Sequence, residues 1–161
     1  MRTRLDALDL KLLARLQEDN IQTADVLAEK VGRSPSAVAR RVRRLRETGT
    51  IAADSAVISD KAAGYPLSAI VHVQLERHAP HEGDALRRRL AASPNVQLCL
   101  DISGAFDILL LVVAADMDAY VAFADTHLAE QPAVRRLETT FVKKRVKATL
   151  TVPLEELVRA R

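Results

Sequence analysis

A chain of 161 residues is long enough for one large domain or two small ones, and its formal net charge is only +3. Hydrophobic residues make up 48% of it, enough for a packed core, whereas the 3% of aromatic residues argues against a protein that holds single-stranded nucleic acid by stacking. No run reaches the roughly 18 apolar residues of a membrane span, and a single cysteine excludes an intrachain disulfide and fits a reducing cytoplasm.

The positive charge is concentrated in one place. Residues 1–62 hold 12 basic and 9 acidic side chains, whereas residues 63–161 hold 12 of each. Six arginines lie between Arg33 and Arg46 with no acid among them, so without these six the first segment would carry −3 instead of +3. A local basic patch in an otherwise balanced chain is typical of a surface that docks a polyanion.

Residues 6–48 predict three short helices. Asp6 is placed to cap the first helix and Thr23 the second, and Gly32 ends the second as glycine often does just past a helix. Ser34 and Pro35 open the third, because serine accepts hydrogen bonds from the free N–H groups of a helix start and proline gives up an N–H that has no partner. The residues expected to face inward from the second and third helices are Val26, Leu27, Val31, Val38, Val42 and Leu45.

Two helices joined by VGRS, the second rich in arginine, follow the helix-turn-helix plan, in which the second helix enters the major groove of DNA. Arginine suits that place because its planar guanidinium can bind phosphate or the O6/N7 edge of guanine with two hydrogen bonds. The alternative is a merely solvated helix face, but the capped frame, the missing acids and an expected β-hairpin wing at 50–59 favour DNA contact. The residues on the outward side are Ser36, Ala37, Arg40, Arg43 and Arg44.

Beyond a hinge at 60–67, which contains Gly64 and Pro66, the pattern changes to alternating strands and helices. The order is βαββαβ, which predicts an α+β, ferredoxin-like sandwich with both helices on one face of the sheet. The other face and the edges stay open, which favours self-association. The segments are 68–75, 81–93, 95–103, 106–115, 116–131 and 133–147.

The turn SGAFD at 103–107 is a candidate ligand site. Gly104 permits a backbone shape that exposes N–H groups able to hold a carboxylate, and Asp107 is placed to meet an ammonium group. A glycine turn beside an aspartate is also common in plain hairpins, so the chemistry alone leaves both interpretations open.

Four stretches together resemble one family: LDALDLKLLARLQEDN, LAEKVGRSPSAVARRVRRLRETGTI, VQLCLDISGAFDILLLVVAADMDAY and VRRLETTFVKKRVK. In order and spacing they are similar to the Lrp/AsnC, or feast/famine, transcription regulators over roughly residues 4–154. The resemblance implies a winged or plain helix-turn-helix and a ligand-binding αβ domain of the RAM type. The expected divisions are a DNA-binding domain at 1–52, a linker at 53–67, an effector and oligomerisation domain at 68–150, and a tail at 151–161.

The resemblance also implies partners and sites. Family members form homodimers that often build tetramers or octamers, and amino acids or related effectors bind in clefts where dimers meet. Positions that fall on the family's recognition helix are Ser34, Ser36, Arg40, Arg41 and Arg44. Positions that fall on its effector site, or beside it, are Gly104, Ala105, Phe106, Asp107, Thr139 and Thr140. Phenylalanine stands at 106 where tyrosine is frequent, so the phenolic hydroxyl is absent and the site is open to a smaller or more apolar effector.

The basic run Lys143, Lys144, Arg145 and Lys147 departs from the family, where acids are common. It is interpreted as lysines that protect an edge strand, with an added path for DNA as the alternative. No metal site, cofactor or catalytic set is predicted, since neither the histidines nor Cys99 show a convincing ligand or nucleophile spacing.

The sequence thus predicts a cytoplasmic, nucleoid-associated, sequence-specific regulator of double-stranded DNA that responds to a small effector and is not an enzyme. The alternatives are an architectural DNA-binding protein that ignores ligands and, less favoured, a siroheme-decarboxylase-like enzyme.

Overall fold

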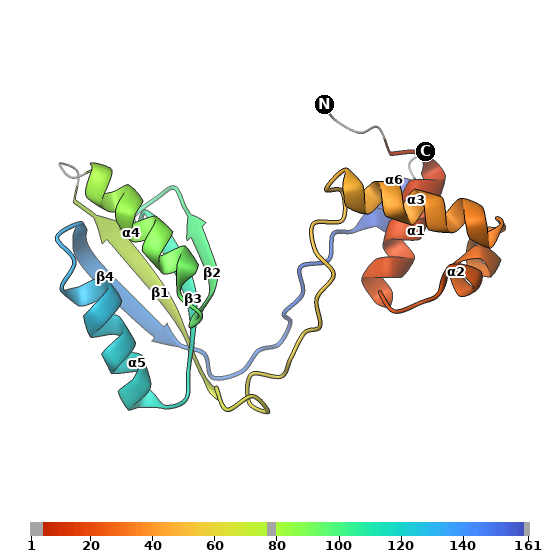
Figure 1. Cartoon of the computed structure of the whole chain (residues 1–161). Helices are drawn as coiled ribbons and strands as arrows, with labels where there is room; N and C mark the ends of the chain where they lie inside the picture. Colours follow the sequence, from red (N-terminus) through yellow and green to blue (C-terminus); the bar gives the residue numbers. More distant parts are fainter. Residues whose placement is uncertain (1–4, 77–79, 160–161) are drawn as a thin grey trace. The chain divides into compact units, whose positions relative to one another are not determined.

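The computed structural model describes residues 5–76 and 80–159, which fall into two compact units (Figure 1). One unit combines Met1–Ala56 with Lys147–Arg161, and the other holds Val57–Val146. The end of the chain therefore belongs to the same unit as its beginning. None of the helices in the described ranges has the length and apolar content to span a membrane.

The three helices of the first unit begin and end where the sequence places them. They are α1 (Ala7–Glu18), α2 (Ala24–Val31) and α3 (Pro35–Glu47). The side chains of Asp6, Thr23 and Ser34 accept the capping hydrogen bonds, and Gly32 ends α2 in the left-handed conformation with φ 63°. The predicted punctuation of the helix-turn-helix is confirmed.

The core of this unit lies between the three helices. Of the six residues predicted to face inward from α2 and α3, five are buried or half-buried, which confirms the prediction for them. The prediction for Val26 is wrong, since this residue is 40% exposed. Leu27 and Ala28 take the buried side of α2 instead. The packed cluster consists of Leu12, Leu16, Leu27, Ala28, Val38 and Val42.

The predicted hairpin wing at 50–59 is wrong. No strand is assigned to those residues, and the four strands of the described chain all lie further on, in one sheet. The Ile51 N–H donates to the Leu45 carbonyl at 3.0 Å, and Arg46 binds Asp54 at 2.7 Å, so one backbone hydrogen bond and one ion pair hold the segment against α3. A lone two-stranded hairpin is marginal in water, and the alanine-rich AADSA offers little to pack.

The first unit also contains the end of the chain. A last helix, α6 (Leu154–Arg159), contacts α1. Gln17 of α1 exchanges two hydrogen bonds with the backbone of Val152, at 3.0 and 2.8 Å. These contacts join the 147–161 segment to the helix-turn-helix.

The second unit is the predicted α+β sandwich. Its antiparallel sheet has the order β2-β3-β1-β4, with α4 and α5 on one face. A π-helical turn, η1 (Asp125–Ala129), continues α5, so the predicted helix at 116–131 has two parts. The elements are β1 (Leu67–Leu75), α4 (Pro80–Ala92), β2 (Val96–Asp101), β3 (Ile108–Ala114), α5 (Met117–Ala124) and β4 (Val134–Phe141).

The last strand is shorter than predicted. It ends at Phe141 rather than at 147, so the basic residues after it do not form an edge strand. Beyond the strand, Arg145 binds the Asp60 carboxylate at 2.5 Å and donates to Ser68 Oγ and Gln97 Oε1. Side-chain bonds thus stand where the sequence predicted a continued strand.

The two faces of the sheet differ in cover. Residues such as Val71 and Leu110 point toward α4 and α5 and are fully buried. The opposite face has no helix on it within the described chain, and it presents partly exposed apolar side chains. By alternation along the paired strands these are Ile70, Leu98, Leu100, Leu109 and Leu111.

Candidate DNA interface and effector turn

Two arginines of α3 are free for an outside partner. Arg40 and Arg43 are exposed, and neither makes a hydrogen bond or ion pair with another described residue. At the start of the helix, Ser34 Oγ accepts from the Ala37 N–H and lies 3.4 Å from Ser36 Oγ. An exposed helix with small polar residues at its beginning and guanidinium groups one turn later has the chemistry to contact the grooves and phosphates of DNA.

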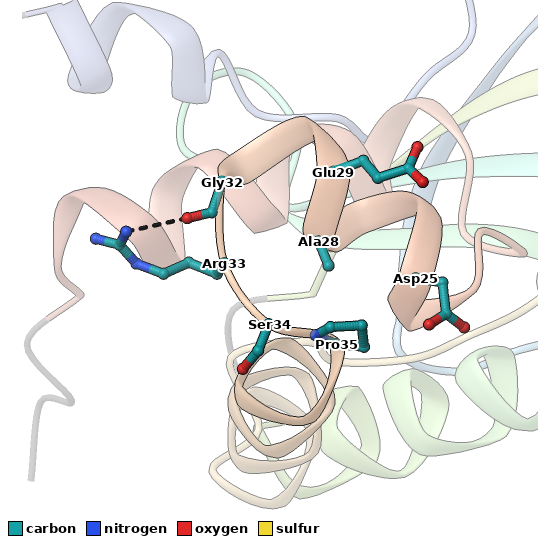
Figure 2. A pocket seen from close by; sticks show the side chains of 7 residues that line it. All are labelled: Asp25, Ala28, Glu29, Gly32, Arg33, Ser34 and Pro35. Carbon is teal, nitrogen blue, oxygen red and sulfur yellow. Dashed lines mark hydrogen bonds between the residues drawn. The ribbon is translucent and has the colours of Figure 1, made fainter.

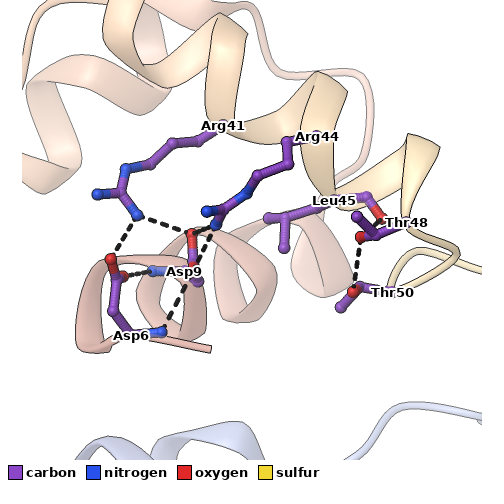
Figure 3. A network of polar contacts seen from close by, with 7 residues as sticks. All are labelled: Asp6, Asp9, Arg41, Arg44, Leu45, Thr48 and Thr50. Atoms are coloured by element: carbon purple, nitrogen blue, oxygen red, sulfur yellow. Dashed lines mark hydrogen bonds and ion pairs between the residues drawn. The ribbon is translucent and has the colours of Figure 1, made fainter. Parts of the chain in front are cut away.

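The other two predicted contacts on α3 already have partners. Arg44 Nη2 donates to both oxygens of Asp9, at 2.6 and 2.7 Å, and Arg41 Nη1 bridges Asp6 and Asp9 (Figure 3). The Asp9 backbone N–H, and then Arg41, lower the pKa of Asp6, and the same pairing raises the pKa of Arg41. The sequence predicted Arg41 and Arg44 as DNA contacts, because their pairing with Asp6 and Asp9 was not foreseen.

Asp9 had a recognisable signal in the sequence. It stands three, four and seven residues before Leu12, Leu13 and Leu16, so it lies on the apolar stripe of α1. A charged residue there is rarely buried unless it is paired, and its side chain is only 1% exposed. Arginines three residues apart on a facing helix are the obvious partners.

A hollow of about 590 Å³ opens at the turn between α2 and α3 (Figure 2). Asp25 and Glu29 border it, while Arg33 folds back to donate to the Gly32 carbonyl at 3.1 Å. Two carboxylates repel an anion, so this hollow is a poor phosphate site. It is lined by Asp25, Ala28, Glu29, Gly32, Arg33, Ser34 and Pro35.

The SGAFD turn is anchored through Asp107. Its Oδ2 accepts from the Leu75 N–H at 2.7 Å, and its backbone N–H donates to the Val73 carbonyl at 2.9 Å. Gly104 has φ 143°, a conformation that residues with a side chain rarely adopt. Asp107 therefore fixes the turn to the end of β1, and one of its carboxylate oxygens is used in a hydrogen bond to the backbone.

A cavity of about 310 Å³ lies against this turn. It is lined by Gln74, Leu75, Glu76, Gly83, Asp84, Arg87, Gly104, Ala105, Asp107 and Arg135. Arg87 is held by Asp101 at 2.6 Å and by Asp84 at 3.2 Å, and the Asp101 carboxylate raises the pKa of Arg87. Arg135 is exposed and has no hydrogen-bonding partner among the described residues. Charges of both signs thus line the cavity.

The other predicted effector residues lie elsewhere. Phe106 packs its ring 5.2 Å from His72 and 5.6 Å from the Arg136 guanidinium, on the open side of the sheet. Thr139 points to the helices, where its hydroxyl lies 2.6 Å from the Tyr120 hydroxyl. Thr140 pairs with Ile70, facing the open side. Three of the six predicted residues, Gly104, Ala105 and Asp107, line the cavity. The other three do not line it within a single chain.

Metal ligands do not cluster in the part of the chain that the structure describes, where no group of three His, Cys, Asp or Glu side chains has metal-binding geometry. Cys99 is half-buried against the core, and burial raises the pKa of its thiol.

Comparison with known families settles the class. Residues 68–152 match the Lrp/AsnC ligand binding domain, and residues 5–52 match a winged helix-turn-helix DNA-binding domain. The chain belongs to the Lrp/AsnC family. This membership makes it a DNA-binding transcriptional regulator and not an enzyme, as the sequence predicted.

Relatives of this Lrp/AsnC regulator match along nearly their whole length. An uncharacterized transcriptional regulator of Sinorhizobium fredii is 38% identical over 151 residues, covering 94% of this chain and 89% of the relative. The leucine-responsive regulatory protein of Haemophilus influenzae is 34% identical over 145 residues, covering 90% of this chain and 87% of the relative. The structure of a transcriptional regulator of Neisseria meningitidis, solved as its L-methionine complex, has 30% sequence identity to this chain and a TM-score of 0.87. The match covers 96% of this chain and 99% of that one.

Proposed function

We propose that this regulator reads specific sites in double-stranded DNA through α3, and that an amino acid alters its DNA binding or assembly. The observation that carries the first part is the exposed side of α3, where Arg40 and Arg43 are unpaired among the described residues and no acid stands between Arg33 and Arg46. Ser34, Ser36 and Ala37 lie at the end of the helix that approaches base edges in this motif. The protein acts in the cytoplasm, on the nucleoid.

The active form in this proposal is a homodimer that can assemble further. The open face of the sheet supports this, since five partly exposed apolar side chains gather there and no helix of the described chain covers them. A dimer presents two copies of α3 to successive major grooves about 34 Å apart on one side of the duplex. Tetramers and octamers would then extend the contact along the DNA.

The effector site in this proposal begins at the Gly104 turn. Arg135 and the turn N–H groups suit a carboxylate, and the Asp107 oxygen that does not bind Leu75 suits an ammonium group. In this proposal neighbouring copies complete the site, with Phe106 and Thr140 coming from the open side of a sheet and Thr139 from the side that faces α5. The L-methionine in the Neisseria relative makes methionine the first amino acid to try, and the apolar Phe106 suits it.

The test is a salt-titrated binding assay on duplex DNA from the gene's own upstream region, against a shuffled duplex of equal composition. We expect preferential, salt-sensitive binding that methionine or a pool of amino acids changes. Binding without preference or response would favour the architectural alternative. No binding at low salt would overturn the DNA contact assigned to α3.

Replacing Asp107 by asparagine tests the effector site. Asparagine keeps an oxygen for the Leu75 N–H but loses the charge, so the turn survives while the ammonium contact weakens. We expect DNA affinity without effector to stay within about twofold, and the amino-acid concentration for a half-maximal response to rise at least about tenfold, as for a lost charged hydrogen bond.

The matched control is Asp118→Asn, which removes the same charge from the exposed start of α5. It should leave the response unchanged. A response that survives Asp107→Asn unaltered would place the effector elsewhere.

A further inference from the structure

Asp9 is a buried carboxylate aimed at the recognition helix from a different helix. Its two oxygens accept four hydrogen bonds, from the Asp6 N–H, Arg41 Nη1 and twice from Arg44 Nη2. A carboxylate has about four lone-pair sites, so this one is saturated. Figure 3 shows both guanidinium groups turned back toward the start of α1.

We infer that Asp9 is a positioning residue for DNA recognition, which withdraws Arg41 and Arg44 from the DNA and leaves Arg40 and Arg43 to contact it. This inference rests on DNA binding by α3. It changes the role of Arg41 and Arg44 from predicted DNA contacts to internal anchors of the recognition helix.

The first support is the division of the six arginines. Arg41, Arg44 and Arg46 each bind a carboxylate of their own unit, at distances of 2.9 Å or less. Arg33 bonds only to a neighbouring carbonyl, and Arg40 and Arg43 have no hydrogen-bonding partner in the described chain. Since every free cation adds sequence-independent attraction to phosphate, pairing half of the run limits non-specific binding.

The second support is the position of the charge. Asp9 occupies the apolar stripe of α1, where a leucine would complete the core without the desolvation cost of a buried ion. Charged hydrogen bonds, here from Arg41 Nη1 and Arg44 Nη2 to one carboxylate, are directional and fix the rotation of α3 about its axis more narrowly than apolar packing does. The rotation decides which arginines face outward, so the pair specifies the DNA-reading side.

The experiment compares Asp9→Asn with Asp25→Asn in the full-length protein, on the upstream and shuffled duplexes over a range of salt. Asp25 is an exposed acid of α2 whose side chain makes no hydrogen bond with another described residue. Both variants remove one negative charge. Asp9→Asn should release Arg44, steepen the salt dependence on the shuffled duplex by about one unit, and raise affinity for it several-fold above Asp25→Asn. The ratio of specific to non-specific affinity should fall.

This expected pattern distinguishes a positioning role of Asp9 from a role in the stability of the fold alone. A variant that is only less stable would bind both duplexes more weakly, and that result would overturn the inference, as would equal behaviour of the two variants. If the wild-type protein binds neither duplex, DNA binding by α3 itself fails, and that outcome is recognised before any variant is compared.

A second variant removes both sides of the network and leaves no unpaired buried charge. It combines Asp9→Asn with Arg41→Gln and Arg44→Gln. If these arginines do not contact DNA in the wild-type protein, the salt dependence should return to the wild-type slope. A slope lower than wild type by about two units would show that both contact phosphate and would overturn the inference. Circular dichroism at the assay temperature confirms that each variant is folded.

Discussion

Replacing Arg40 and Arg43 together by glutamine is expected to lower affinity for the upstream duplex by about 100-fold or more. Both side chains are exposed on α3 without hydrogen-bonding partners in the described chain, so their loss should cost contacts to DNA and little within the protein. Each hydrogen bond to a charged group contributes about 1.5–3 kcal/mol, and about 1.4 kcal/mol is a tenfold change. The salt slope should fall by about two units if both bind phosphate.

The matched control is Arg88→Gln with Arg89→Gln. Both side chains are exposed on α4, in the other unit, and the change in net charge is the same. Filter binding or fluorescence anisotropy on both duplexes measures the difference. If the control lost as much affinity as the α3 variant, DNA attraction would depend on overall charge, and the assignment of α3 as the contact helix would be wrong.

Local features of the fold could be predicted because their causes are local. Asp6, Thr23 and Ser34 cap helices through bonds to residues three positions away, and Gly32 ends α2 by its own backbone freedom. The strands of the second unit follow from alternation within each segment. Such features need no knowledge of what lies opposite in space.

The misses have causes in distant contacts. The segment after β4, which was predicted as strand, is held by an ion pair between Arg145 and Asp60, which lies 85 residues away in the sequence. Arg41 and Arg44 are paired within the protein because Asp9 lies opposite them on another helix. A helical wheel gives the direction of a side chain's Cβ, but a long arginine side chain can reach around to a buried acid. Charge on the apolar stripe of α1 was the available clue.

The effector site shows a different limit. The resemblance placed Gly104, Phe106 and Thr139 in one site, and within a single chain they lie respectively at a turn, on the open side of the sheet and against α5. Residues on opposite sides of one sheet can share a ligand only if another copy brings its own residues beside them. The proposed site shared between subunits accounts for this separation, because different copies can supply residues from different faces.

Replacing Leu12 by alanine is expected to destabilise the helix-turn-helix unit by about 2–5 kcal/mol, the usual cost of a buried leucine. Leu12 is fully buried in the cluster that joins the three helices. A unit of this size is stable by only about 0.05–0.15 kcal/mol per residue, so the loss approaches its whole stability. DNA affinity should fall with it, because α3 is held in place by that cluster.

The two units have separate apolar cores, and this makes the measurement specific. In a calorimetric scan, Leu12→Ala should lower the midpoint temperature of one unfolding transition and leave the midpoint of the αβ unit unchanged. Leu150→Ala is the matched control, since Leu150 belongs to the same unit but is 95% exposed, and it should change stability by no more than about 0.5 kcal/mol. If both transitions fell together after Leu12→Ala, the two units would unfold as one, and the separate cores would not act as separate folding units.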